Sequence, residues 1–237
     1  NISPSDDFLH PNPSLPPNIL SDFSPASADE VRCAILASSN ATCSLDSIPT
    51  RLLKSCLDSL VIPITTLTNF SLSEATFHPQ LKSAIVNPLL KKPALPHDDL
   101  ASYRPISNLN FISKILERII HSRLSDHLQT FPSISSYQSA YRKYHSTETA
   151  LLRIHNDLLL GINQQKLSAL VLLDLSAAFD TIDHNILLNR LTRTFGVTGK
   201  ALSLLSSYIT NRTQSLIIND HLTSPSALHT GVPQGSV

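Results

Sequence analysis

The chain of 237 residues contains no methionine and no tryptophan, and only five glycines and three cysteines. The cysteines form no CxxC pair and have no histidine at ligand spacing, which argues against a zinc site or a disulfide framework. No run of eighteen apolar residues is present, and the start lacks the basic-then-apolar layout of a signal peptide, so we expect no membrane partner. The missing methionine indicates an internal piece of a longer protein, which we expect to be nuclear and cytoplasmic.

The formal net charge is zero, but the charges are unevenly distributed. Lys and Arg number 3 against 8 Asp and Glu in residues 1–75, 10 against 5 in residues 76–153, and 5 against 5 in residues 154–237. The middle third is therefore basic. Such a segment can be a solvated face or a surface that binds a polyanion.

The first part of the chain changes in composition near residue 26. Residues 1–25 contain six prolines, a composition typical of an extended linker. From Ser27 the pattern becomes helical, because Ser27 and Glu30 resemble a capping box and Val31, Ile35 and Leu36 form an apolar stripe. Further helices are predicted near residues 50–60 and 63–74.

Two longer helices are predicted in the basic third. Apolar residues at helical spacing predict a long amphipathic helix that reaches Leu128, namely Ile112, Ile115, Leu116, Ile119 and Ile120. A second helix is expected to begin after Ser146, a suitable N-cap, with one apolar face formed by Leu151, Ile154, Leu158 and Ile162.

The last third mixes strands and helices. The apolar run ALVLLDL at 169–175 predicts a buried strand with Asp174 at its carboxyl end. Helices are expected from about Asp183 and over residues 200–210, and QSLII at 214–218 before Asn219–Asp220 suggests a hairpin. The order of elements predicts an α/β (α+β) fold with a helix-rich N-terminal part.

Asp174 is the first candidate for chemistry. An acid at the end of a buried strand is held accurately enough to bind a metal ion, but it can equally cap the following turn. Nucleotidyl transfer requires carboxylates that hold two magnesium ions, and one Asp does not supply these.

Four segments carry a resemblance. VLLDLSAAFDTIDH (171–184) resembles the first palm motif of reverse transcriptases from non-long-terminal-repeat (long interspersed element type) retrotransposons. YQSAYRKYHSTETAL (137–151) is similar to their fingers motif, and NPLLKKP with SYRPISNLNFISKILERI is similar to the segments before it. GVPQGSV (231–237) resembles the motif that opens the next palm helix. Together they span roughly residues 80–237.

The resemblance implies roles for individual residues. Asp174 would be the catalytic metal ligand, with the backbone carbonyl of Leu175 as a second oxygen donor. Phe179 would block the 2′-hydroxyl of a ribonucleotide, although it can also be a core aromatic. Asp180 and Asp183 would organise the turn and cap the next helix instead of binding metal.

The remaining implied residues would hold the nucleotide. Arg142 would contact the triphosphate, with help from Lys91 or Lys92, which by themselves would read as solvated surface lysines. The family's Gly-Phe before the arginine is replaced here by Ala140 and Tyr141. Gln234 would lie near the templating base pair, and Gly235 would allow the backbone to approach closely.

The resemblance also implies an organisation and partners. It implies right-hand polymerase fingers and a partial palm, divided into a linker (1–26), a helical N-terminal extension (27–75), fingers (76–163) and a truncated palm (164–237). The expected partners are an RNA template, a DNA primer or target, deoxynucleoside triphosphates and an upstream endonuclease domain. The cofactor would be Mg²⁺ in a two-metal site that is incomplete here, because the family's Ala-Asp-Asp motif does not occur in the sequence.

Three functions are therefore considered. The first is a fragment of an RNA-directed DNA polymerase, and the second is an inactive relic or repurposed nucleic-acid-binding fragment. The third takes Asp174 as the nucleophile of a haloacid-dehalogenase-like phosphatase. That family requires a second Asp two residues later, where this chain has Ser176.

Overall fold

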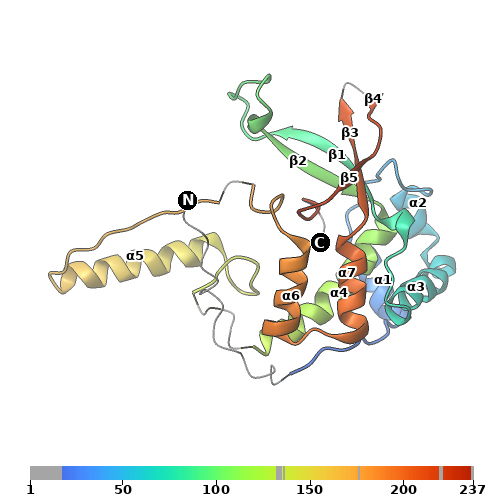
Figure 1. Ribbon diagram of the computed structural model, residues 1–237, viewed down its shortest axis with the longest axis horizontal. Coiled ribbons are helices and arrows are strands. Elements are labelled where there is room, and N and C mark those ends of the chain that lie inside the picture. The colour runs from blue at the N-terminus through green and yellow to red at the C-terminus, as the bar shows by residue number, and fades with distance from the viewer. Residues whose placement is uncertain (1–17, 132–134, 136, 176, 219–220, 236–237) are drawn as a thin grey trace, which may run out of the picture. The chain divides into compact units, whose positions relative to one another are not determined.

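The structure is a computed structural model that describes residues 18–131, 135, 137–175, 177–218 and 221–235. These residues form two compact units, one of residues 18–130 and 177–235 and the other of residues 131–175 (Figure 1). The helices of the first unit are α1 (Ala28–Leu36), α2 (Thr50–Ser55), α3 (Leu57–Ser73), α4 (Phe111–Gln129), α6 (His184–Phe195) and α7 (Gly199–Ile209). Its strands are β1 (Ser83–Leu90), β2 (Tyr103–Leu109), β3 (Arg212–Ile218), β4 (His221–Leu222) and β5 (Ser226–Leu228), and α5 (Thr147–Asn163) belongs to the second unit.

The predicted helix starts are confirmed by their caps. The side chains of Ser27 and Asp183 accept hydrogen bonds from the backbone N–H groups of Glu30 and Ile186, and Ser146 caps α5 in a capping box with Thr149. Each cap satisfies a backbone donor that the first helical turn leaves unpaired.

Two details of the helical prediction are wrong. Leu36 was expected in the buried stripe of α1, but its side chain is 55% exposed, whereas Val31 and Ile35 are fully buried. The break between the second and third helices lies at Cys56, and α3 continues through Pro63. Proline removes only one helical hydrogen bond, and the buried Val61 and Ile64 beside it anchor α3 in the core.

The core of the first unit is built mainly from helices. Val31, Ile35, Ile115, Val197 and Leu204 are all fully buried in one apolar cluster to which α1, α3, α4 and α7 contribute. The predicted long helix is confirmed, since α4 ends at Gln129 and was expected to reach Leu128. Its buried residues lie between Phe111 and Ile120. Its apolar stripe therefore places it against the core. Ser113 and Glu117 of α4 are buried as well, and the Ser113 hydroxyl donates to Glu117 Oε1 (3.2 Å).

A mixed sheet accompanies this helical core (Figure 1). Its strand order is β2-β1-β3-β4, with β5 also paired to β3. β1 is antiparallel to β2, with Leu89 opposite Arg104, and parallel to β3, with Ile85 opposite Ser215. β4 pairs with β3 on the other side of residues 219–220, so the predicted hairpin forms, although its two turn residues lie outside the described part of the chain.

The segment before α1 binds to three elements. Leu20 exchanges backbone hydrogen bonds with the turn between α6 and α7, where its N–H donates to Gly196 O (3.0 Å) and its carbonyl accepts from Thr198 N (2.9 Å). The Asn69 side chain on α3 accepts from Ala26 N (2.7 Å) and donates to Ala26 O (3.0 Å).

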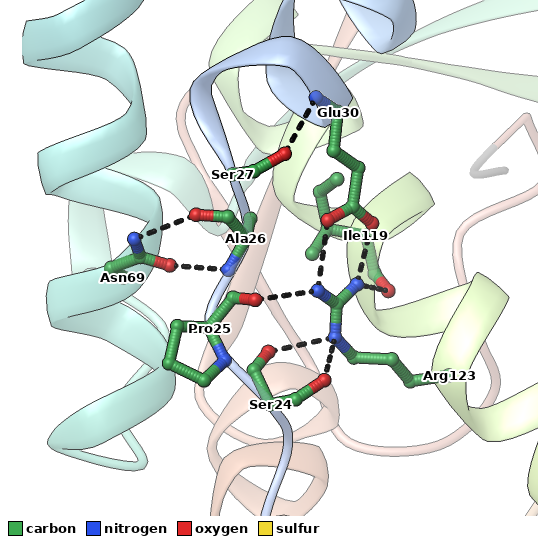
Figure 2. A network of polar contacts seen from close by, with 8 residues as sticks. All are labelled: Ser24, Pro25, Ala26, Ser27, Glu30, Asn69, Ile119 and Arg123. Carbon is green, nitrogen blue, oxygen red and sulfur yellow. Dashed lines mark hydrogen bonds and ion pairs between the residues drawn. The ribbon is translucent and has the colours of Figure 1, made fainter.

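Arg123 on α4 completes this attachment (Figure 2). Its guanidinium donates to both carboxylate oxygens of Glu30, at 2.8 and 3.0 Å, and to the carbonyls of Ser24 (2.7 Å), Pro25 (3.1 Å) and Ile119 (3.1 Å). The Arg123 bond lowers the pKa of the Glu30 carboxyl group, against a smaller opposing effect of burial. The Arg123 side chain therefore joins α4 to α1 and to Ser24 and Pro25 in the segment before α1.

The second unit contains little besides α5. None of the described residues of α5 is buried, and the side chains of Leu151 and Ile162 on the predicted face are 59% and 64% exposed. Of the four residues of the predicted apolar face, Leu158 is half-buried and the other three are exposed. No helix in the described part of the chain is long and apolar enough to cross a membrane.

Candidate functional site

The segment that contains Asp174 is not a strand. Residues 169–175 form no ladder with the described strands, and Leu173 and Leu175 are 92% and 80% exposed. This corrects the prediction of a buried strand. A strand requires a neighbour to satisfy its backbone groups, and an apolar sequence alone does not provide one. Asp174 therefore lies on an exposed segment of the second unit.

Arg142 also belongs to the second unit, and it is exposed. Its Nη1 makes long contacts with the carbonyls of Ser135 (3.4 Å) and Gln138 (3.5 Å) in its own loop. Tyr141, just before it, has a φ of 57°. Tyr144 is also left-handed, with a φ of 62°. Ala140, which occupies the family's glycine position, is not among the residues with a positive φ.

Lys91 and Lys92 lie in the first unit, directly after β1. Lys91 is held to the η3 turn (Leu100–Ser102), where its backbone N–H donates to Ser102 O (2.9 Å) and its Nζ to Ala101 O (2.8 Å). The β1–β2 register places Arg104 opposite Leu89, two residues before Lys91. Arg104, like Lys91 and Lys92, is exposed. The β1–β2 hairpin therefore carries three exposed positive charges.

Arg104 is a candidate that the sequence interpretation missed. It lies in the segment SYRPISN, for which the sequence predicts no strand. The available signal for a strand was weak, because only Tyr103 and Ile106 in this segment favour a strand and a proline lies between them. Only the pairing of β1 with β2 places it beside the two lysines.

The loops that carry Phe179 and Gln234 are joined by hydrogen bonds between residues 179–184 and residues 231–232, and we call this contact the clasp. Val232 N donates to Phe179 O (2.9 Å), Gly231 N donates to Ile182 O (2.8 Å), and the buried His184 ring shares a hydrogen bond of 2.8 Å with Gly231 O. Phe179 is 44% exposed, so it is not a core aromatic. The clasp joins segments some fifty residues apart in the sequence.

Gly231 is required by this clasp. Its φ is +80°, and a Cβ atom on it would lie 2.8 Å from Asp180 Cα and from the carbonyl oxygens of Phe179 and Asp180. Only glycine accepts both this conformation and this approach. The glycine of the GVPQG motif thus holds the loop after Asp174 against the loop that carries Gln234.

Asp180 and Gln234 make the contact at the end of the clasp. Gln234 Nε2 donates to Asp180 Oδ1 (3.1 Å) and lies 3.3 Å from Oδ2. The Gln234 carbonyl accepts from Ser107 N (2.7 Å), which ties the motif to β2. Asp183 caps α6 as expected, but the pairing of Asp180 with Gln234 was not predicted.

Gly235 allows a close approach to the protein's own backbone. Its φ is +112°, and a Cβ atom there would lie 2.8 Å from the carbonyl oxygen of Ser107. The predicted need for glycine is therefore explained by the contact with β2 in this structure. Gly235 and Gln234 together attach the motif to the β1–β2 hairpin.

The described residues do not by themselves form a site for two metal ions. No group of three or more His, Cys, Asp or Glu side chains with ligand geometry occurs among them. Asp174 supplies one exposed carboxylate, and two-metal chemistry requires more than one. Of the predicted set, the structure brings Phe179, Gln234 and Gly235 together at the clasp. Lys91 and Lys92 lie in the same unit after β1, while Arg142, Asp174 and Leu175 lie in the second unit.

Comparison with known proteins gives the family. Residues 90–237 match the family described as reverse transcriptase (RNA-dependent DNA polymerase). The chain is 28% identical over 193 residues to a probable RNA-directed DNA polymerase from transposon BS of Drosophila melanogaster, with 81% of this chain and 21% of the relative covered. It is 28% identical over 218 residues to that of the X-element of the same fly, with 92% and 24% covered.

A third relative agrees with these two. The RNA-directed DNA polymerase from the mobile element jockey of Drosophila melanogaster is 32% identical over 139 residues, which cover 59% of this chain and 15% of the relative. The chain spans about a fifth of the length of the relatives it matches. Since the family match covers more than half of this chain, from the β1–β2 hairpin through the clasp, the chain belongs to the reverse transcriptase (RNA-dependent DNA polymerase) family of the non-long-terminal-repeat retrotransposon type.

Proposed function

We propose that this chain supplies the fingers and part of the palm of an RNA-directed DNA polymerase, which extends a DNA 3′-hydroxyl on an RNA template. The clasp between Phe179 and Val232 carries the proposal. Its backbone hydrogen bonds join the loop of Phe179, the predicted sugar-selecting residue, to the loop that carries Gln234, which is itself bonded to β2. The clasp lies within the residues matched by the family. The phosphatase alternative has no comparable support.

Each residue would act through its own chemistry. Phe179, half-exposed, would exclude a 2′-hydroxyl by its bulk, and Gln234 would be oriented toward the template by Asp180. Lys91, Lys92 and Arg142 would hold the triphosphate.

Asp174, with the Leu175 carbonyl, would supply one carboxylate and one carbonyl to magnesium, whose remaining protein ligands must come from other residues. The division into linker (1–26), N-terminal extension (27–75), fingers (76–163) and palm (164–237) is part of this proposal. So is an upstream endonuclease in the intact protein.

Primer extension tests the polymerase function. The protein lengthened by about the next hundred residues of its gene should elongate a DNA primer on RNA with magnesium. Asp174→Asn should reduce the rate by at least about a hundredfold, because it removes a metal ligand. Asp157→Asn is a matched control, since Asp157 is an exposed acid on α5 with no proposed role.

Sugar selection gives a second measurement. Phe179→Ala should increase ribonucleotide incorporation relative to deoxynucleotide incorporation, because the steric barrier is removed while the clasp backbone stays the same. Absence of elongation by the longer protein with its carboxylates intact would refute the polymerase proposal.

A second candidate is a nucleic-acid-binding fragment without catalysis. The unpaired, exposed segment around Asp174 favours it, because a catalytic carboxylate needs a rigid support. The chain itself would then bind RNA weakly and with strong salt dependence. Charge reversal of Lys91, Lys92 and Arg142 to Glu should abolish this binding, and binding that ignores salt would contradict it.

A further inference from the structure

His184, the first residue of α6, is a buried histidine that hydrogen-bonds to another loop. It is 9% exposed, and its Nε2 lies 2.8 Å from Gly231 O. A carbonyl oxygen only accepts, so Nε2 carries the hydrogen atom and donates it. The start of the helix is fixed as well, because Asp183 caps α6 by accepting from Ile186 N (3.0 Å). His184 is therefore a donor whose position is set by a helix.

The carbonyl that His184 binds belongs to the same rigid group as a second clasp bond. Gly231 C=O and Val232 N–H are the two polar ends of one planar peptide unit. The N–H end of this unit donates to Phe179 O (2.9 Å). The loop of residues 179–184 therefore holds one peptide at both ends, through His184 at its oxygen and through Phe179 at its nitrogen.

Gly231 makes this double hold necessary. Its φ is +80°, and a residue without a side chain has the widest choice of backbone conformations. Its own N–H donates to Ile182 O (2.8 Å), which anchors the glycine but leaves rotation of the following peptide free. The bond from His184 to the carbonyl removes that freedom.

Loss of the His184 donor would therefore act on Phe179. Gly231 is buried, and a buried carbonyl without a partner is unfavourable, so the peptide would turn toward another donor. Val232 N–H turns with the carbonyl, because the peptide is planar, and would leave Phe179 O. The Phe179 side chain is 44% exposed, so packing holds it only in part. Its position then depends on its backbone.

We infer that His184 is a positioning residue that acts through the Gly231–Val232 peptide on Phe179, and so sets how strictly the polymerase excludes ribonucleotides. This role rests on the proposed function, in which Phe179 blocks a 2′-hydroxyl. The hold on the peptide does not rest on it. A steric barrier depends on where the blocking side chain stands, so a residue that fixes its backbone contributes to selection without touching the nucleotide.

Amide hydrogen exchange in the 237-residue chain measures the hold on the peptide by NMR. His184→Phe keeps a buried ring but removes the donor, so Val232 N–H should exchange about three- to tenfold faster, the effect of one hydrogen bond. Gly231 N–H should change less, because Ile182 O still holds it. His184→Gln should restore slow exchange, since its amide nitrogen is as many bonds from the backbone as Nε2 of histidine.

Primer extension by the longer protein measures the role in sugar selection. His184→Phe should raise ribonucleotide incorporation relative to deoxynucleotide incorporation about three- to tenfold, and His184→Gln should restore the ratio. A merely structural role would reduce the amount of active enzyme and lower both rates equally. In the Phe179→Ala background, His184→Phe should change the ratio no further, because it acts through Phe179.

His127→Phe is the matched control. His127 lies on α4, and its Nε2 is 2.6 Å from Phe195 O at the other end of α6, so the variant removes the same kind of bond away from the clasp. It should leave the Val232 exchange rate and the sugar ratio unchanged. If His184→Phe does not fold, His184→Asn takes its place, because its amide nitrogen is one bond too short to reach Gly231 O.

Unchanged exchange of Val232 N–H in the His184 variants refutes the hold on the peptide. Faster exchange with an unchanged sugar ratio, in a longer protein that elongates primers, refutes the role in selection and leaves the proposed function intact. A sugar ratio that changes as much in His127→Phe also refutes it. No elongation by the wild-type longer protein refutes the proposed function, and the exchange rates alone then decide whether His184 holds the peptide.

Discussion

Replacing Arg123 with methionine tests whether one side chain fastens the segment before α1 to the first unit. Methionine keeps much of the apolar stem of arginine but removes the guanidinium and its hydrogen bonds to Ser24, Pro25 and Glu30. The Arg123 side chain is only 14% exposed, whereas that of Glu30 is 37% exposed. Solvent therefore weakens the ion pair more than it weakens the bonds to the carbonyls.

The expected loss follows from these two parts. A partly exposed ion pair contributes up to about 1 kcal/mol. The charge-assisted bonds to the two carbonyls contribute about 1–2 kcal/mol together, because water replaces part of them in the variant. We therefore expect Arg123→Met to lower the free energy of unfolding by about 1–3 kcal/mol.

Urea unfolding followed by far-ultraviolet circular dichroism measures this loss. Arg190→Met serves as a control at an exposed arginine and should change the free energy by less than about 0.5 kcal/mol. The double variant Arg123→Met with Glu30→Gln should show a coupling of about 1 kcal/mol. A loss for Arg123→Met no greater than that for Arg190→Met would refute this account of the network in Figure 2.

Three further predictions concern the first unit. The wild type should be more stable than Glu30→Gln, fully so above pH 4.5, and this difference should disappear as the pH falls through the lowered pKa of Glu30. The reason is that a carboxyl group with a lowered pKa stabilises the fold only while it is ionised. Urea unfolding of both proteins at several pH values tests this. Asn69→Asp should cost about 1–2 kcal/mol in urea unfolding, since it removes the donor to Ala26 O and places a carboxylate there, and an unchanged midpoint would contradict it. Gly231→Ala should cost about 1–3 kcal/mol, because its φ of +80° and the backbone 2.8 Å away exclude a Cβ atom. Gly161→Ala on α5, where the nearest atom is a mobile side-chain hydroxyl, should show no such loss.

The sequence determined the helices and their starts. Helical caps and apolar periodicity are local, so the caps Ser27, Ser146 and Asp183 and the stripe of α4 could be recognised without a tertiary structure. The family motifs also belong to the sequence, since they are short strings of residues. Local patterns therefore predicted the family and most of the helical frame.

The tertiary structure decided the strands and the assembled part of the site. β1 and β2 lack regular alternation, because their burial depends on which neighbour covers each face, and they were not predicted. The run at 169–175 has the composition of a strand but no partner among the described residues, so it is not one. The contact between Asp180 and Gln234, 54 residues apart, depends on the clasp at Gly231. Pairing between distant segments is a property of the whole fold, and no local pattern encodes it.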